Sequence, residues 1–231
     1  MNNFIKEAQQ LKARAVALRE AKDFKGSEQL LLKAQQMLSA RMPDGKCGPA
    51  GPMEMEVAKA LANICGSLGG TYREWGRFEE SVNAYDDGFE YEDSPRYGIV
   101  NSYNLVQRLV ARILFDRDWA LAPERTILKK KFPGALECAE AEIQTQLRGS
   151  RQNDEYALAD QAMIALLLGR TTHLELWRRL RGYAKNQFVI EATSRVLDEI
   201  QKNFDTDAAS KPGSDHLDAF LLRVREARES L

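Results

Sequence analysis

The sequence predicts an all-α protein, an α-α superhelix of helical hairpins with divergent helices toward the C-terminal end. Three observations support this prediction. Apolar residues recur at spacings of three and four along most of the chain, as in helices that bury one face. Short connections rich in Gly, Pro and Asp separate these stretches. Alternating apolar and polar runs bounded by hairpin-turn pairs, which are typical of β-strands, do not occur.

The first half of the chain predicts two helical hairpins and a further helix. A tight connection at 21–27 divides the first hairpin. Residues 42–52 include six Gly or Pro and predict a loop, because Pro lacks an amide donor and Gly loses much entropy in a helix. The expected elements are a hairpin over 4–38, the loop, a hairpin over 53–91 and a helix over 97–115.

The second half predicts shorter, less regular helices. An irregular stretch is expected over 116–134, and a polar linker over 204–214. The last helix has an apolar stripe on an otherwise charged surface, so it either caps the end of the superhelix or forms a homodimer. The expected helices cover 135–147, 155–168, 174–183, 188–203 and 215–230. We therefore expect one superhelical domain over 1–203 and a capping or dimerisation helix over 215–231.

The strongest motif is a repeat signature over 68–85. It begins with Leu68 and Gly69, continues with Tyr72 and ends a helix at Gly76. Small residues let two helices of a hairpin cross closely, and aromatic residues fill the space beside the crossing. The second helix supplies Phe78, Ser81, Tyr85 and Gly88 at the matching offsets. This pattern resembles the tetratricopeptide (TPR) repeat, with its clearest unit over 62–95.

The first hairpin fits the same frame with a constant offset of 54 residues. That offset equals one repeat of about 34 residues plus about twenty inserted residues, which the loop over 42–52 and a longer helix can absorb. A degenerate repeat is therefore expected over 8–41. The matching pairs are Phe24 with Phe78, Ser27 with Ser81, and Ala34 with Gly88.

A second resemblance covers more of the chain, roughly 54–200. The segments 97–101, 154–160 and 166–170 look like the TPR-bearing TRAFs-binding domain of apoptosis signal-regulating kinases and its bacterial relatives. That resemblance implies a non-catalytic scaffold that regulates an effector in bacterial signalling or defence. The expected partner is another protein or a peptide.

TPR proteins commonly bind peptides on the concave surface of their first helices, which predicts a partner-binding groove here. The candidate residues are Lys12, Arg73, Asn101, Asn104 and Arg108. The subset that holds a C-terminal carboxylate needs an Asn where this chain has Val16, so that specialised use is doubtful. The alternative for Asn101 and Asn104 is that they satisfy backbone groups near a helix start.

Other function classes receive weaker support from the sequence. Two basic clusters, Lys129–Lys131 and Arg178–Arg181, leave a nucleic-acid-binding superhelix as an alternative, although nearby acidic residues dilute their field. A small-ligand site between the divergent helices is another. Gly66, Gly69 and Gly70 lack the lysine of a phosphate-binding loop and favour close helix packing.

No catalytic, metal-binding or cofactor-binding constellation is recognisable in the sequence. The three cysteines are widely spaced and form no CxxC pair, so we expect no metal site, no cofactor and no enzyme activity. The formal net charge of −1 gives no general attraction to nucleic acid or membranes. No apolar run is long enough to span a bilayer, and the N-terminus lacks a secretory signal pattern. A cytoplasmic location is therefore expected.

Overall fold

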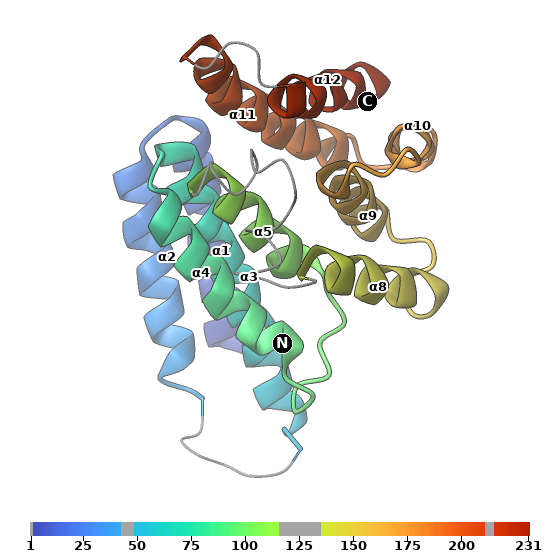
Figure 1. Cartoon of the computed structure of the whole chain (residues 1–231). Helices are drawn as coiled ribbons and strands as arrows, with labels where there is room; N and C mark the ends of the chain where they lie inside the picture. The colour runs from blue at the N-terminus through green and yellow to red at the C-terminus, as the bar shows by residue number, and fades with distance from the viewer. Residues whose placement is uncertain (1, 43–48, 116–134, 211–214) are drawn as a thin grey trace. The chain divides into compact units, whose positions relative to one another are not determined.

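The computed structural model describes residues 2–42, 49–115, 135–210 and 215–231 (Figure 1). Within these residues the chain forms ten α-helices and no β-strand, which confirms the all-α prediction. The chain divides into two compact units, Met1–Arg112 and Ile113–Leu231, whereas the sequence predicts one domain over 1–203. Among the described helices, none is both long and apolar enough to span a bilayer.

The first unit contains two hairpins and most of a fifth helix. In each hairpin, a residue at the turn itself determines where one helix ends or the next begins. Asp23 caps one helix by accepting a hydrogen bond from Gly26 N at 2.9 Å, and Gly76 ends another in the left-handed conformation, φ 82°. The helices are α1 (Asn3–Glu20), α2 (Phe24–Ser39), α3 (Pro52–Trp75), α4 (Phe78–Asp93) and α5 (Tyr103–Phe115).

Hydrogen bonds between α2 and α3 fix their relative direction. Ser27 near the start of α2 bonds Thr71 near the end of α3 (Oγ to Oγ1 3.2 Å). Gln35, farther along α2, donates to Sγ of Cys65, which lies earlier in α3. The two helices therefore run antiparallel, and α1, which joins α2 by a tight turn, runs parallel to α3.

The same reasoning orients α5. Asn104 donates to the Ala62 carbonyl oxygen, and the later Gln107 accepts from the later Arg73, so α5 runs parallel to α3. Helices α1, α3 and α5 thus share one direction, while α2 and α4 run the opposite way. These five helices form the blue-to-green part of Figure 1.

Small residues lie buried where the hairpin helices cross, as the repeat pattern predicts. Ser81 Oγ donates to the Gly69 carbonyl oxygen at 2.8 Å, and the fully buried Tyr85 ring lies against Gly69. In the first hairpin, Ala15 and Ser27 are fully buried. Arg77 also joins the hairpins through an ion pair with Glu28 at 2.9 Å.

Helix α5 begins later than the sequence predicts, at Tyr103 rather than at residue 97. Gly98 has φ 59°, which a continuing right-handed helix does not allow. Asn101 then forms a turn just before the new helix, because its Oδ1 accepts from the backbone amides of Ser102 and Tyr103.

The second unit is organised around α9, which is apolar on nearly all sides. A helix with apolar residues around its whole circumference must be covered on every face. Helices α8, α10, α11 and α12 all contact it. Asp154 caps its start and Gly169, with φ 68°, ends it. The helices are α8 (Ala135–Arg148), α9 (Glu155–Leu168), α10 (His173–Tyr183), α11 (Gln187–Ser210) and α12 (Asp215–Ser230).

The structure tests two predictions for the second half of the chain, the linker over 204–214 and the apolar stripe of the last helix. Helix α11 continues to Ser210, so the first part of the predicted linker over 204–214 is helical. Phe204 is fully buried against Phe220 of α12, with ring centroids 5.3 Å apart, and this packing supports the extension. The apolar stripe of α12 is buried against its neighbours in the second unit. The irregular stretch over 116–134 lies outside the described residues.

Candidate functional site

The glycines of α3 accommodate side chains from three other helices. A Cβ on Gly69 would lie 2.7 Å from the Tyr85 ring of α4, and one on Gly70 would lie 2.7 Å from Nη1 of Arg19 of α1. A Cβ on Gly66 would meet the side chains of α5 at 2.8 Å. These residues lie in the interior of a continuous helix, so the prediction of close helix packing is confirmed.

A buried carboxylate organises the start of α5. Glu92 is only 7% exposed, and its Oε1 accepts from Nδ2 of Asn101 at 2.6 Å and from Nδ2 of Asn104 at 2.8 Å. Its Oε2 accepts from the backbone amide of Asn104 at 3.2 Å. Because this amide is in the first turn of α5, the carboxylate also faces the positive end of the helix dipole.

Asn104 links three helices. It is buried between α3 and α4, where Gly66 and Gly88 leave room for its amide group. Its Nδ2 donates to the Ala62 carbonyl oxygen at 3.1 Å in addition to Glu92. The alternative predicted for both residues, bonding to backbone groups near a helix start, holds for Asn101. The Asn104 side chain instead bonds distant groups, the Ala62 carbonyl oxygen and the Glu92 carboxylate.

The two candidate arginines also contact neighbouring helices. Arg73 is 6% exposed and donates to Gln107 of α5 and, at 3.3 Å, to the Tyr85 hydroxyl. Arg108 lies 3.8 Å over the Phe89 ring and 3.5 Å from Oδ1 of Asp86. Burial lowers the pKa of Arg108 from its ordinary value.

Lys12 differs from the other four candidates. Its side chain is half-buried on α1, and within the described part of the chain no carboxylate pairs with it. Burial lowers its pKa, and the nearby positive charge of Arg19 lowers it further. Lys12 is therefore a cation with a partly removed hydration shell and no counter-ion, which makes a negatively charged ligand favourable.

Arg19 extends this basic surface toward α3. Its guanidinium lies over Gly70 and pairs with Glu74, with Nε 3.4 Å from Oε1. Lys12 lies two turns earlier on the same side of α1. Because α1 and α3 run parallel and Arg19 lies over Gly70, we expect Lys12 to lie near residue 63 of α3. Residues 64–70 of α3 are buried, so we call Lys12, Val16 and Arg19 of α1, with the exposed Asn63 of α3, the α1–α3 face.

The structure therefore brings four of the five candidates together around α3, α4 and α5. Arg73, Asn101, Asn104 and Arg108 connect these helices, while Lys12 lies on α1. That all five line one partner-binding groove stays a prediction. Glu92 was missed by sequence reasoning, although a signal existed: it follows Tyr85 and Gly88 at helical spacing, so it falls on the buried side of α4.

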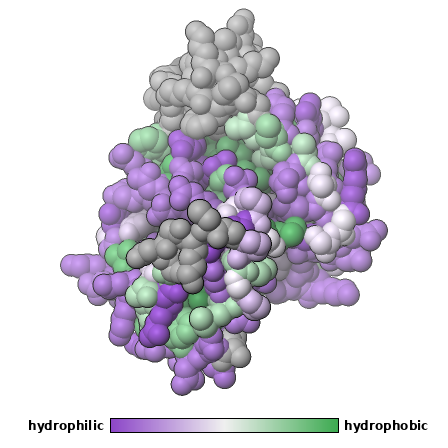
Figure 2. Space-filling view, turned by 90° about the horizontal axis from the view of Figure 1, so that it is seen from below, coloured by the Kyte–Doolittle hydropathy of each residue, from purple (hydrophilic) through white to green (hydrophobic). Residues whose placement is uncertain are grey.

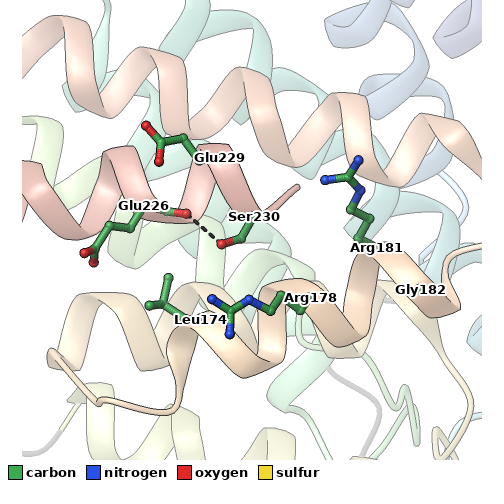
Figure 3. A pocket seen from close by; sticks show the side chains of 7 residues that line it. All are labelled: Leu174, Arg178, Arg181, Gly182, Glu226, Glu229 and Ser230. Atoms are coloured by element: carbon green, nitrogen blue, oxygen red, sulfur yellow. Dashed lines mark hydrogen bonds between the residues drawn. The ribbon is translucent and has the colours of Figure 1, made fainter.

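A charged cavity of about 740 Å³ lies between α10 and α12 (Figure 3). Arg178 and Arg181 line it from α10, and Glu226 and Glu229 line it from α12. Neither arginine forms an ion pair with any residue that the structure describes. Arg178 and Arg181 belong to one of the basic clusters predicted from the sequence. The other, Lys129–Lys131, lies outside the described residues.

His173 is buried on α10 beside α12. It is 3% exposed, and its Nδ1 has no hydrogen-bond partner in the described structure. Burial lowers its pKa below the ordinary value of 6.5, Glu226 acts to raise it, and Arg223 lowers it. The net effect is that His173 resists protonation in the folded chain.

We expect the stability of the second unit to fall as the pH falls below 6.5. Above that value His173 is neutral in both states, whereas below it the unfolded chain takes up a proton first, which favours unfolding. The contribution is at most about 1.4 kcal/mol per pH unit. Urea denaturation at several pH values, compared between the natural chain and His173→Gln, measures it. Equal pH profiles for the two chains would contradict the assignment.

The two described cysteines differ sharply in their surroundings. Cys138 is exposed, while Cys65 is buried in α3 and burial raises its pKa to about 12. The Cys65 thiol therefore stays protonated at neutral pH and is a poor nucleophile. Among the described residues, no three His, Cys, Asp or Glu side chains are grouped to hold a metal ion.

We expect Cys65 to resist thiol reagents until the chain unfolds. In a chain carrying Cys47→Ser and Cys138→Ser, a chromogenic disulfide reagent at pH 8 should release almost no product, because the thiol is protonated and covered. Addition of urea should release one equivalent per chain. Rapid reaction of the folded double variant would show that Cys65 is accessible.

The chain matches no family model, no curated protein and no solved structure.

Proposed function

We propose that residues 1–112 form a TPR-like module that binds a segment of another protein on the α1–α3 face. In this proposal the chain is a non-catalytic scaffold that regulates an effector, in keeping with the resemblance to TPR-bearing signalling domains. The observation that carries the proposal is Lys12, a half-buried cation that has no counter-ion among the described residues and lies on the face where a TPR module would take its ligand.

The direction and spacing of the helices support the TPR-like part of the proposal. Helices α1, α3 and α5 are parallel and alternate with α2 and α4, as the first and second helices of TPR repeats do. The hydrogen bond between Arg73 and Gln107 joins positions 34 residues apart, which is one repeat length. Ser27 and Ser81, matched at the offset of 54, are both fully buried.

The polar character of the surface supports a ligand held by charges and hydrogen bonds. On the molecular face shown in Figure 2, hydrophobic residues form small separate patches among hydrophilic ones. Lys12 provides positive charge on the α1–α3 face, whereas Arg19 is paired with Glu74, and Asn63 of α3 is exposed. An acidic segment of a partner would therefore suit this face.

Site-directed photo-crosslinking in the native host tests the proposal. A photoreactive residue at position 16 of the α1–α3 face should capture a distinct protein, identified by mass spectrometry. The same residue at position 33, which is exposed on α2, is the matched control. Lys12→Glu should weaken the captured partner's affinity by about ten-fold or more. Capture of the same proteins from both positions would contradict the proposal.

The cavity between α10 and α12 favours binding of a small charged ligand as a second candidate function. Two guanidinium groups on one wall and two carboxylates on the other suit a molecule that carries both charges. Glutamate at millimolar concentration should raise the melting temperature if it binds there. Arg178→Ala combined with Arg181→Ala should abolish the rise. Binding of nucleic acid with a steep salt dependence would instead favour the basic-cluster alternative.

A further inference from the structure

Three exposed aromatic side chains surround the turn between α10 and α11 in the second unit. Tyr156 stands in the first turn of α9, Tyr183 ends α10 and Phe188 lies in the first turn of α11. Their exposed fractions are 42%, 38% and 44%. Single exposed apolar residues are common on protein surfaces, but several around one turn indicate an interaction site.

The turn that carries these rings is held by specific hydrogen bonds. Oε2 of Glu155 accepts from the backbone amides of Lys185 and Asn186, at 2.8 and 3.2 Å. Asn186 donates from Nδ2 to the Tyr156 hydroxyl at 3.3 Å, and its Oδ1 accepts from the amide of Phe188 at 3.0 Å. The backbone that carries these aromatic side chains is therefore already ordered before a ligand binds, which lowers the entropic cost of binding.

Tyr156 and Tyr183 line one shallow cavity of about 470 Å³. Its remaining lining residues are Asn153, Asp154, Glu155 and Lys185. Of all six lining residues, Asn153, Tyr183 and Lys185 carry side-chain donors that have no hydrogen-bond partner among the residues the structure describes. The cavity thus combines aromatic rings with uncommitted donors.

The two carboxylates at the cavity already have partners. Asp154 is paired with Arg151, Oδ2 to Nε 2.9 Å, and caps the start of α9 through two backbone amides. Glu155 is bound to the turn amides. These neutral amides leave the charge of Glu155 in place, but Lys185 at the same cavity offsets it, so the cavity has little net charge to attract a basic or an acidic ligand.

These features fit an uncharged ligand with compact apolar rings and free carbonyl groups. A polyproline II segment has both, because proline rings stack on aromatic side chains and its backbone carbonyls have no internal hydrogen-bond partners. Its preformed shape also costs little entropy to bind. We propose that the Tyr156–Tyr183 cavity binds a proline-rich segment of a partner protein. This site belongs to the second unit and does not depend on the α1–α3 face.

Titration of the full chain with a blocked deca-proline peptide, followed by NMR or calorimetry, tests the proposal. A blocked decapeptide of Gly and Ser is the control ligand. Deca-proline should bind and shift the resonances of Tyr156 and Tyr183, while the control peptide should not. Tyr183→Ala should weaken binding by about ten-fold or more, since one stacking surface is lost. Tyr183→Phe should have a smaller effect, because the ring remains and only the donor is removed.

Leu222→Ala is the matched control variant, because Leu222 is another exposed apolar residue of the second unit, 54% accessible on α12. It should leave the affinity unchanged. Circular dichroism should show that all variants keep the helical content of the natural chain. No deca-proline binding at millimolar concentration, or equal affinity in natural chain and Tyr183→Ala, would overturn the proposal. So would tighter binding of a deca-lysine peptide, or concentration-dependent dimers that Tyr183→Ala abolishes.

Discussion

Replacing Glu92 by alanine should lower the free energy of unfolding of the first unit by about 3 kcal/mol. The Glu92 carboxylate is buried and accepts hydrogen bonds from the side-chain amides of Asn101 and Asn104 and from the backbone amide of Asn104. Without it, these buried donors lose their acceptor where water has little access. The first turn of α5 also loses the negative charge that its dipole favours.

Urea denaturation of the full chain measures the loss, and hydrogen exchange in α5 assigns it to the first unit. Glu90→Ala is the matched control, because Glu90 is exposed on the same helix and should change stability by less than about 0.5 kcal/mol. Glu92→Gln keeps the shape but puts an amide among donors, so an intermediate loss is expected. Similar stability of Glu92→Ala and Glu90→Ala would mean that the carboxylate does not organise α5.

Replacing Gly69 by alanine should destabilise the first unit by about 2 kcal/mol. In most helices this change would stabilise by up to about 1 kcal/mol, because alanine has the higher helix propensity. Here the added Cβ would lie 2.7 Å from the Tyr85 ring. The ring is fully buried and its hydroxyl accepts from Arg73, so it has little room to shift. The steric cost therefore exceeds the gain in propensity.

Gly182→Ala is the matched control, because it places the same substitution in another helix and should raise stability where Gly69→Ala lowers it. Gly182 lies in α10, and a Cβ there would have no atom within 4 Å. Its substitution should raise stability slightly, by up to about 1 kcal/mol. Melting temperatures of the two variants, measured by circular dichroism, should move in opposite directions. A rise for Gly69→Ala would show that the two helices of the second hairpin are not in close contact at this residue.

The sequence predicted the helices well where their signals are local. Asp23, Gly76 and Gly169 act at the turns beside them, and the structure places helix ends there. The predicted end of α11 was wrong because distant contacts decide it. Helix α11 runs past the expected linker start, because Phe204 packs on Phe220 and Asp205 pairs with Arg225 of α12, 3.3 Å apart. Local composition does not contain those partners.

The candidate site shows the same division. Lys12, Arg73 and Asn104 look alike in the sequence as polar residues on predicted helices, but their surroundings differ. Arg73 is buried because α5 packs over it and supplies Gln107 as its partner, and Asn104 is buried because α5 packs its own side chain against α3 and α4. Lys12 keeps partial exposure and has no ion pair with any described residue. Which polar residue remains available to a ligand depends on how a later helix packs.

By itself the sequence determined that this protein is all-helical, where its hairpins lie and which small residues mark their crossings. Those features depend on apolar periodicity, caps and glycines, which act within a few residues of the chain. Only the tertiary structure decided the partners of Glu92 and Arg73, the length of α11 and the aromatic cluster around Tyr183. These depend on contacts between residues far apart in the chain, and hydrogen bonding and burial are settled only when the helices have packed.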